Sequence, residues 1–112
     1  MDQRALIDVD IGSLPEEFEI ELAGSNVFLR FDYNGQGQFF TVDLYDNAHN
    51  PIVLGEKLVY GRRLWGDFTK PSIPRVDIVP YDISGKENTV TLENVGRTVF
   101  LYLMTFADDG VD

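Results

Sequence analysis

The chain has 112 residues, with nine basic against nineteen acidic side chains and a formal net charge of -10. Phosphate backbones are bound largely by lysine and arginine, so this balance argues against direct nucleic-acid binding. The hydrophobic content of 44% predicts an ordered core, and the absence of cysteine excludes disulfides, cysteine nucleophiles and thiolate zinc sites.

Short runs rich in β-branched and aromatic residues alternate with Gly, Pro, Asn and Asp, which is typical of an all-β chain. We expect strands at residues 4–11, 17–23, 26–33, 38–45, 52–60, 76–81 and 97–106, with residues 89–92 as an eighth strand or a connector. They predict one domain, residues 1–112: a small antiparallel β-barrel or β-sandwich of about seven to eight short strands without substantial helix.

The beginning of the chain carries no targeting signal that we recognise. Residues 1–10 lack the apolar stretch of a signal peptide, and no apolar run approaches the ~20 residues of a membrane span. We therefore expect no membrane association. We also expect the protein to act in the compartment where it is made, or to leave it by a route that is not encoded at its N-terminus. Asp8 and Asp10 share a face of the first strand, but in so acidic a chain such a pair arises by chance.

The second predicted strand has the pattern of a half-buried strand with an acidic outer face. Phe18, Ile20 and Leu22 alternate with three glutamates, at positions 17, 19 and 21. A period of two places the apolar residues on one side and the carboxylates on the other.

Residues 31–40, FDYNGQGQFF, allow two interpretations. Asp32 and Asp43 fall at the first and twelfth positions of a calcium-loop pattern, but such a loop needs a flanking helix on each side, and both flanks alternate with period two. A hairpin with a type II′ turn at Gly35–Gln36 fits better, because it pairs Leu29 with Val42 on one apolar face. We predict the hairpin and no calcium site.

We find no pattern that predicts catalysis. His49 is the single histidine and lies in a turn, and the chain has no G-x-S-x-G elbow and no phosphate-binding or dinucleotide-binding fingerprint. We therefore predict a protein that is not an enzyme and needs no cofactor or metal.

Large aromatic side chains fall where a solvent-facing strand position would normally be polar. On the outer face of the hairpin they form either a second packed layer or a protein-contact patch. The same choice arises at residues 60–75, where four basic residues gather, Arg75 among them. The candidate interface residues are Phe28, Phe39, Tyr45, Tyr60, Arg62, Arg63, Trp65, Phe68 and Lys70.

Several motifs along residues 5–104 resemble the baseplate plug family of tailed bacteriophages. They are the Leu-Pro step before Phe-x-Ile-x-Leu at 14–22, Leu-Arg and Tyr-Asn within 29–34, Asp-Leu-x-Asp at 43–46, Asn-Pro-Ile-Val at 50–53, the glycines and leucines from 55 to 64, and the Glu-Asn-Val-Gly turn at 93–96.

The resemblance implies a small all-β structural protein of a phage tail or tail-derived particle, without catalytic residues. Its partners would be hub, spike or tube proteins of the baseplate. It would be oligomeric within the particle, with a monomer as one option for the isolated protein, and it would be assembled in the host cytoplasm.

Two other functions compete with this one. A carbohydrate-binding β-sandwich would use Trp65, Tyr60 or Phe68 as a stacking platform for sugar rings. An acidic inhibitor that mimics nucleic acid would bind a basic enzyme in a salt-sensitive way.

Overall fold

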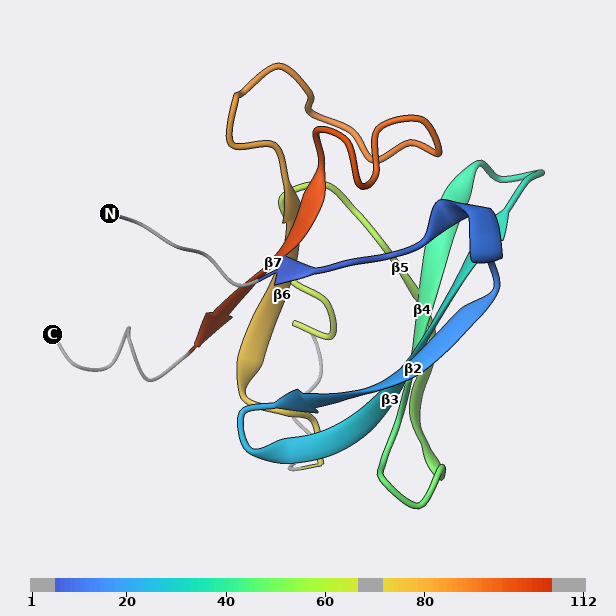
Figure 1. The fold of residues 1–112 in the computed structure, drawn as a ribbon, viewed down its shortest axis with the longest axis vertical. Helices are drawn as coiled ribbons and strands as arrows, with labels where there is room; N and C mark the ends of the chain where they lie inside the picture. Colours follow the sequence, from blue (N-terminus) through green and yellow to red (C-terminus); the bar gives the residue numbers. More distant parts are fainter. Residues whose placement is uncertain (1–5, 67–71, 106–112) are drawn as a thin grey trace, which may run out of the picture.

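The protein folds into two antiparallel sheets packed face to face (Figure 1). The structure is a computed structural model, and it describes residues 6–66 and 72–105. One sheet has the strand order β1 (Leu6–Ile7), β7 (Phe100–Thr105), β6 (Val76–Tyr81). The other has the order β2 (Glu16–Leu22), β3 (Ser25–Asn34), β4 (Phe39–Tyr45), β5 (Pro51–Lys57). Neither sheet closes on itself, so the predicted all-β fold is a sandwich rather than a barrel.

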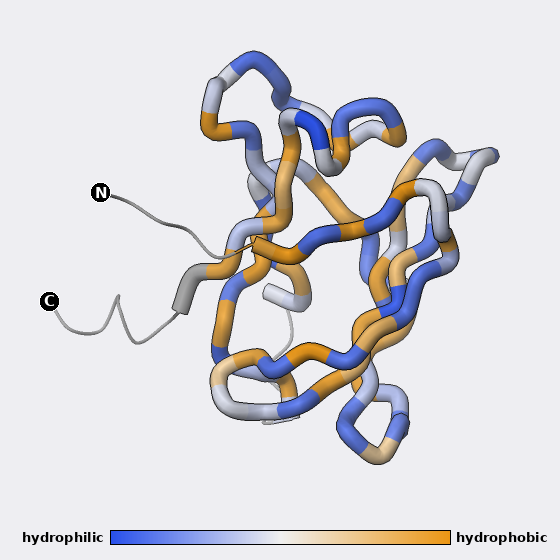
Figure 2. Tube along the Cα trace, in the orientation of Figure 1, coloured by the Kyte–Doolittle hydropathy of each residue, from blue (hydrophilic) through white to orange (hydrophobic). Residues whose placement is uncertain are grey.

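The core lies between the two sheets and comes from alternate positions on their strands. Leu29, Phe31, Val42, Leu44 and Ile78 are each fully enclosed. Hydrophobic and hydrophilic residues alternate along β2 and β3 in the hydropathy trace (Figure 2), as a sheet with one buried and one solvated face requires.

The β3–β4 hairpin forms where it was predicted, but its turn and register differ. A four-residue loop, 35–38, replaces the two-residue turn, and Gln38 N–H donates to the Asn34 carbonyl at 2.7 Å. Leu29 therefore pairs with Leu44 instead of Val42, a shift of two residues. Because two residues are one full period of a strand, the inward side chains remain inward.

Three predicted strands are shorter than expected. The chain leaves the first strand after Ile7 because the Asp10 carboxylate accepts hydrogen bonds from Gly12 N and Ser13 Oγ, which shape the 3-10 turn η1 (Ile11–Ser13). The fifth strand ends at Lys57, before a turn in which Arg62 N–H donates to the Val59 carbonyl. The strand predicted at residues 97–106 begins only at Phe100 and ends at Thr105.

The late start of β7 follows from an ordered loop between β6 and β7. The Asn94 carbonyl accepts the N–H groups of residues 97, 98 and 99 at 3.0–3.1 Å, which holds them in a turn instead of a strand. Residues 89–92 form no strand and act as a connector.

Within the ranges 6–66 and 72–105, no helix has the length and apolar character needed to cross a membrane.

Candidate protein-contact surfaces

The outer face of the four-stranded sheet carries a cluster of three neighbouring rings. Phe28 lies directly opposite Tyr45 in the β3–β4 register. The His49 ring stacks on Phe28 with centroids 4.4 Å apart and planes 16° apart, and lies 5.1 Å from the Tyr45 ring. We call Phe28, Tyr45 and His49 the ring cluster. Two of the residues that the sequence nominated thus lie side by side, with a third ring that it had assigned only to a turn.

A compact loop places His49 over this face. The Asp46 carboxylate accepts the Ala48 and Asn50 N–H groups at 2.9 and 2.8 Å, and His49 itself has a φ of +68°. The Asn50 backbone bond is the main cause that lowers the pKa of Asp46. His49 Nε2 then lies 2.6 Å from Glu17 Oε2 on β2, so one histidine ties the β4–β5 loop to the edge strand.

Phe39 lies apart from the ring cluster, at the opposite end of β4. Its ring lies over the backbone of Gly37, and Lys57 Nζ lies 4.9 Å from the ring centroid. Phe28, Phe39 and Tyr45 are each half-buried. Half-burial fits side chains at a contact surface better than side chains beneath a complete second layer.

The second nominated region, residues 60–75, is only partly a surface. Arg62 and Arg63 are exposed and line a pocket of about 210 Å³ with Glu56 and Lys57. Arg63 Nη1 lies 3.8 Å from an Asp77 carboxylate oxygen. Phe68 and Lys70 lie outside the described residues.

Tyr60 serves as a support for the β6–β7 loop. Its ring stacks on Tyr81 at 5.4 Å, and its hydroxyl accepts the Asp82 N–H at 2.9 Å. The ring is half-buried, and one of its faces is stacked on Tyr81.

Trp65 lies inside the protein and not on a surface. It is 3% exposed, belongs to the core between the sheets, and its backbone N–H donates to Glu56 Oε2 at 2.9 Å. A ring enclosed in this way cannot stack on a sugar from solvent. The prediction of Trp65 as an exposed platform is therefore wrong, because its side chain belongs to the buried core cluster.

Two buried polar residues that the sequence did not single out organise the β6–β7 loop. Asp82 and Asn94 are 2% and 6% exposed. Asn94 Nδ2 donates to Glu87 Oε1 and to the Thr89 carbonyl. The run Asp-Ile-Ser-Gly is a signal for an Asx turn, and it could have identified Asp82.

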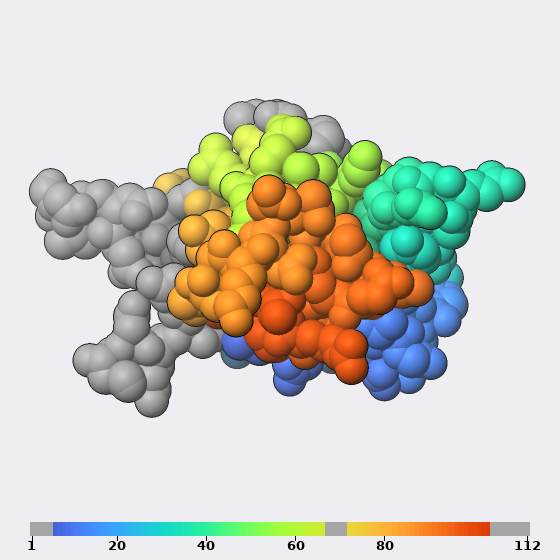
Figure 3. Space-filling model, turned by 90° about the horizontal axis from the view of Figure 1, so that it is seen from above, coloured from blue at the N-terminus to red at the C-terminus, as the bar shows by residue number. Residues whose placement is uncertain are grey.

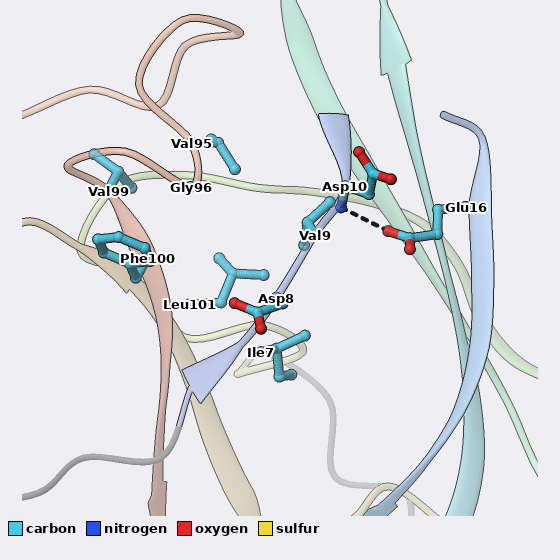
Figure 4. Close-up of a pocket in the computed structure, with 10 residues that line it drawn as sticks. All are labelled: Ile7, Asp8, Val9, Asp10, Glu16, Val95, Gly96, Val99, Phe100 and Leu101. Atoms are coloured by element: carbon cyan, nitrogen blue, oxygen red, sulfur yellow. Dashed lines mark hydrogen bonds between the residues drawn. The ribbon is translucent and has the colours of Figure 1, made fainter. Parts of the chain in front are cut away.

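A pocket of about 230 Å³ opens between β1, β7 and the start of β2 (Figure 4). Asp8, Asp10 and Glu16 contribute carboxylates to it, but Glu16 Oε1 accepts the Asp10 N–H at 2.8 Å and the Asp10 carboxylate caps η1. In the described part of the chain, no group of three or more such side chains is placed to hold a metal ion. Asp32 and Asp43 face Thr41 and Arg30 on adjacent strands and do not form a calcium loop.

A comparison with protein-family models finds one that matches residues 4–107, described as "Cyanophage baseplate Pam3 plug gp18". The match covers nearly the whole chain and confirms the resemblance to phage baseplate plug proteins. No curated protein matches the chain significantly.

Proposed function

Because the chain belongs to the cyanophage baseplate plug family, a family of phage structural proteins, we propose that it docks to hub, spike or tube proteins at the distal end of a phage or tail-derived particle. It acts through protein contacts and without catalysis, and it is incorporated in the host cytoplasm during assembly. The family match over residues 4–107 is the observation that carries this proposal.

The ring cluster is the first docking surface that we assign. Aromatic residues are enriched among the side chains that dominate binding energy at protein interfaces. Phe28 and Tyr45 are half-buried within a regular sheet, so they are held rigidly and lose little conformational freedom when a partner covers them. The contact of His49 Nε2 with Glu17 holds the third ring of the cluster in place.

Arg62 and Arg63 form the second surface, for an acidic partner. Both are exposed on a chain whose net charge is -10, and they lie next to Lys57 at the mouth of the same pocket. Charged groups in such a rim set the rate and specificity of association more than its strength. We therefore expect a weaker effect on assembly from these arginines than from the ring cluster.

Mass spectrometry of purified particles, with chemical cross-linking, tests the proposed function. We expect the protein at a few copies per particle, with cross-links from the exposed Lys57 and Lys86 to hub, spike or tube proteins. Its absence from intact particles would contradict the proposal.

A double substitution, Phe28→Ser with Tyr45→Ser, tests the ring cluster as the docking surface. Loss of two central aromatic contacts costs about 2 kcal/mol or more in an interface, so incorporation into particles should fall by roughly thirtyfold. Leu54→Ser is the matched control, because Leu54 is 58% exposed on β5 and is not a member of the ring cluster. Circular dichroism of each purified variant separates loss of docking from loss of folding.

A further inference from the structure

The strand β2 is a free edge of its sheet, with the regular backbone that another strand needs for antiparallel pairing. In the four-stranded sheet it lies outermost and pairs with β3 through seven consecutive residues without a register shift. No described residue makes a backbone hydrogen bond to its other side. Alternate N–H and C=O groups of residues 17–22 therefore point outward without a backbone partner among the described residues.

The opposite edge of the same sheet is a poor template. The β4–β5 register shifts twice, Gly55 has a φ of +74°, and β5 begins at Pro51, which has no N–H to donate. Irregularities of this kind turn an edge away from further pairing. Of the two edges of this sheet, among the residues that the structure describes, only β2 combines a regular backbone with an open side.

Side chains on both faces of β2 indicate what the edge accepts. On the outer face, Glu17 is held by His49, whereas the carboxylates of Glu19 and Glu21 have no partner among the described residues. On the inner face, Phe18 and Ile20 pack against the core but are only half-buried. An added strand would place its side chains beside the carboxylates of Glu19 and Glu21. It would also complete the burial of Phe18 and Ile20.

We propose that β2 accepts an extended segment of another particle protein as a fifth strand of this sheet, with Lys or Arg facing Glu19 and Glu21 and apolar residues facing Phe18 and Ile20. The partner class rests on the proposed function. A second copy of this chain is a poor occupant, because pairing two β2 edges brings glutamates against glutamates.

A blocked peptide of the same length as β2 that alternates lysine and valine is the probe for this edge. We expect saturable binding to the purified protein, with slowed amide exchange confined to residues 16–22. Two further peptides carry N-methyl groups on the odd or the even positions. One set of N–H groups faces β2 and the other faces solvent, so one peptide should lose binding and the other keep it. Equal binding by both would overturn strand addition and indicate plain charge attraction.

Charge variants test the selectivity of the edge. Glu19→Lys should weaken binding of the lysine peptide by about three- to tenfold and favour a matched glutamate peptide instead. Glu93→Lys, an exposed position in the loop before β7, makes the same change in net charge and should leave the preference almost unchanged. Equal effects of the two variants would contradict the proposal.

Amide exchange on intact particles separates this inference from the proposed function. If the protein is present and residues 16–22 are protected relative to the free protein, strand addition holds in the particle. If it is present and these amides exchange at the free rate, the edge proposal fails while the structural role stands. If it is absent from particles, the proposed function fails, and peptide binding still decides whether β2 accepts a strand.

Discussion

At the scale of single residues, Leu29 is one of the fully enclosed positions of the core, where a smaller side chain leaves a cavity. It lies between Phe18 on β2 and Leu44 on β4 in the strand register. Leu29→Ala should lower the free energy of unfolding by about 2–5 kcal/mol, through lost transfer free energy and a residual cavity. Urea denaturation measures this loss, and Leu54→Ala is the control, because Leu54 is 58% exposed. A loss below about 0.5 kcal/mol would contradict the position of Leu29 in the core.

Asp82 should make stability depend on pH in the acid range. Its carboxylate accepts hydrogen bonds from Ser84 Oγ at 2.7 Å and from the N–H groups of Ser84, Lys86 and Glu87 at 2.9–3.1 Å. These bonds, led by the Ser84 hydroxyl, lower the pKa of Asp82 in the folded state. The unfolded state therefore binds a proton first, so this stabilisation is present above about pH 4 and is lost as pH falls through the lower folded-state pKa.

Asp82→Asn tests this linkage, because an amide nitrogen cannot accept the bonds that the second carboxylate oxygen accepts. We expect a lower urea midpoint than the unsubstituted protein at pH 7, and a difference that shrinks as pH falls toward 3. Asp8→Asn serves as control, since Asp8 is exposed. A difference that stays constant over this pH range would show that the Asp82 carboxylate does not carry the effect.

Residue type alone could not separate buried from exposed aromatic positions. Trp65 follows two arginines and a leucine, and its local sequence resembles that of a surface loop. Its burial depends on contacts with Glu56 and the core, which lie distant in sequence. The outward-facing positions of Phe28 and Tyr45, in contrast, follow from strand periodicity within one hairpin. The sequence left open whether a second layer covers them.

At the scale of elements, the β3–β4 hairpin shows which part of a register the sequence determines. The alternation of apolar residues determines which face each side chain occupies, and that prediction is confirmed. The loop length was wrong because Asn34 makes a local bond that a two-residue turn would exclude: its Oδ1 accepts the Gly37 N–H at 2.9 Å. An even shift of register preserves both faces, so periodicity alone could not distinguish the alternatives.

The tip of this hairpin, which projects from one end of the molecule (Figure 3), contains two glycines with different surroundings. A Cβ at Gly37 would lie 2.2 Å from the Phe39 ring, whereas a Cβ at Gly35 would meet nothing within 4 Å. Gly37→Ala should therefore displace the ring and lower stability by about 1 kcal/mol, the lower end of the range for overpacking, because Phe39 is half-buried.

Gly35→Ala is the matched control and should change stability by less than about 0.5 kcal/mol. Thermal denaturation of both variants, with the aromatic side-chain resonances of Phe39 followed by NMR, makes the comparison. Equal stability of the two variants, with an unmoved Phe39 ring, would contradict the packing of Phe39 over Gly37.

At the scale of the whole molecule, the pairing of strands distant in the chain determines the architecture. β1 pairs with β7, so the two ends of the described chain meet in one sheet. Local patterns predict strands and hairpins but carry no signal for such a closure, which is why barrel and sandwich remained equal alternatives from sequence. The edge strand β2 is a consequence of this closure, since the chain crosses from one sheet to the other through η1.

The net charge of -10 acts over the whole molecule and gives the final prediction. With a radius of gyration of 13.8 Å, most charges lie within about 30 Å of one another, the Debye length at 0.01 M salt, whereas that length is about 10 Å at 0.1 M. Raising NaCl from 0.01 to 0.1 M at pH 7 should therefore reduce self-repulsion and raise Tm by about 2–5 °C. Salt also weakens attractive pairs such as Arg63 with Asp77, but exposed pairs contribute only about 0–1 kcal/mol. Near the isoelectric point, about pH 4.3, the rise should vanish, because the net charge is then close to zero. A Tm that falls with salt at pH 7 would mean that local ion pairs outweigh the net repulsion.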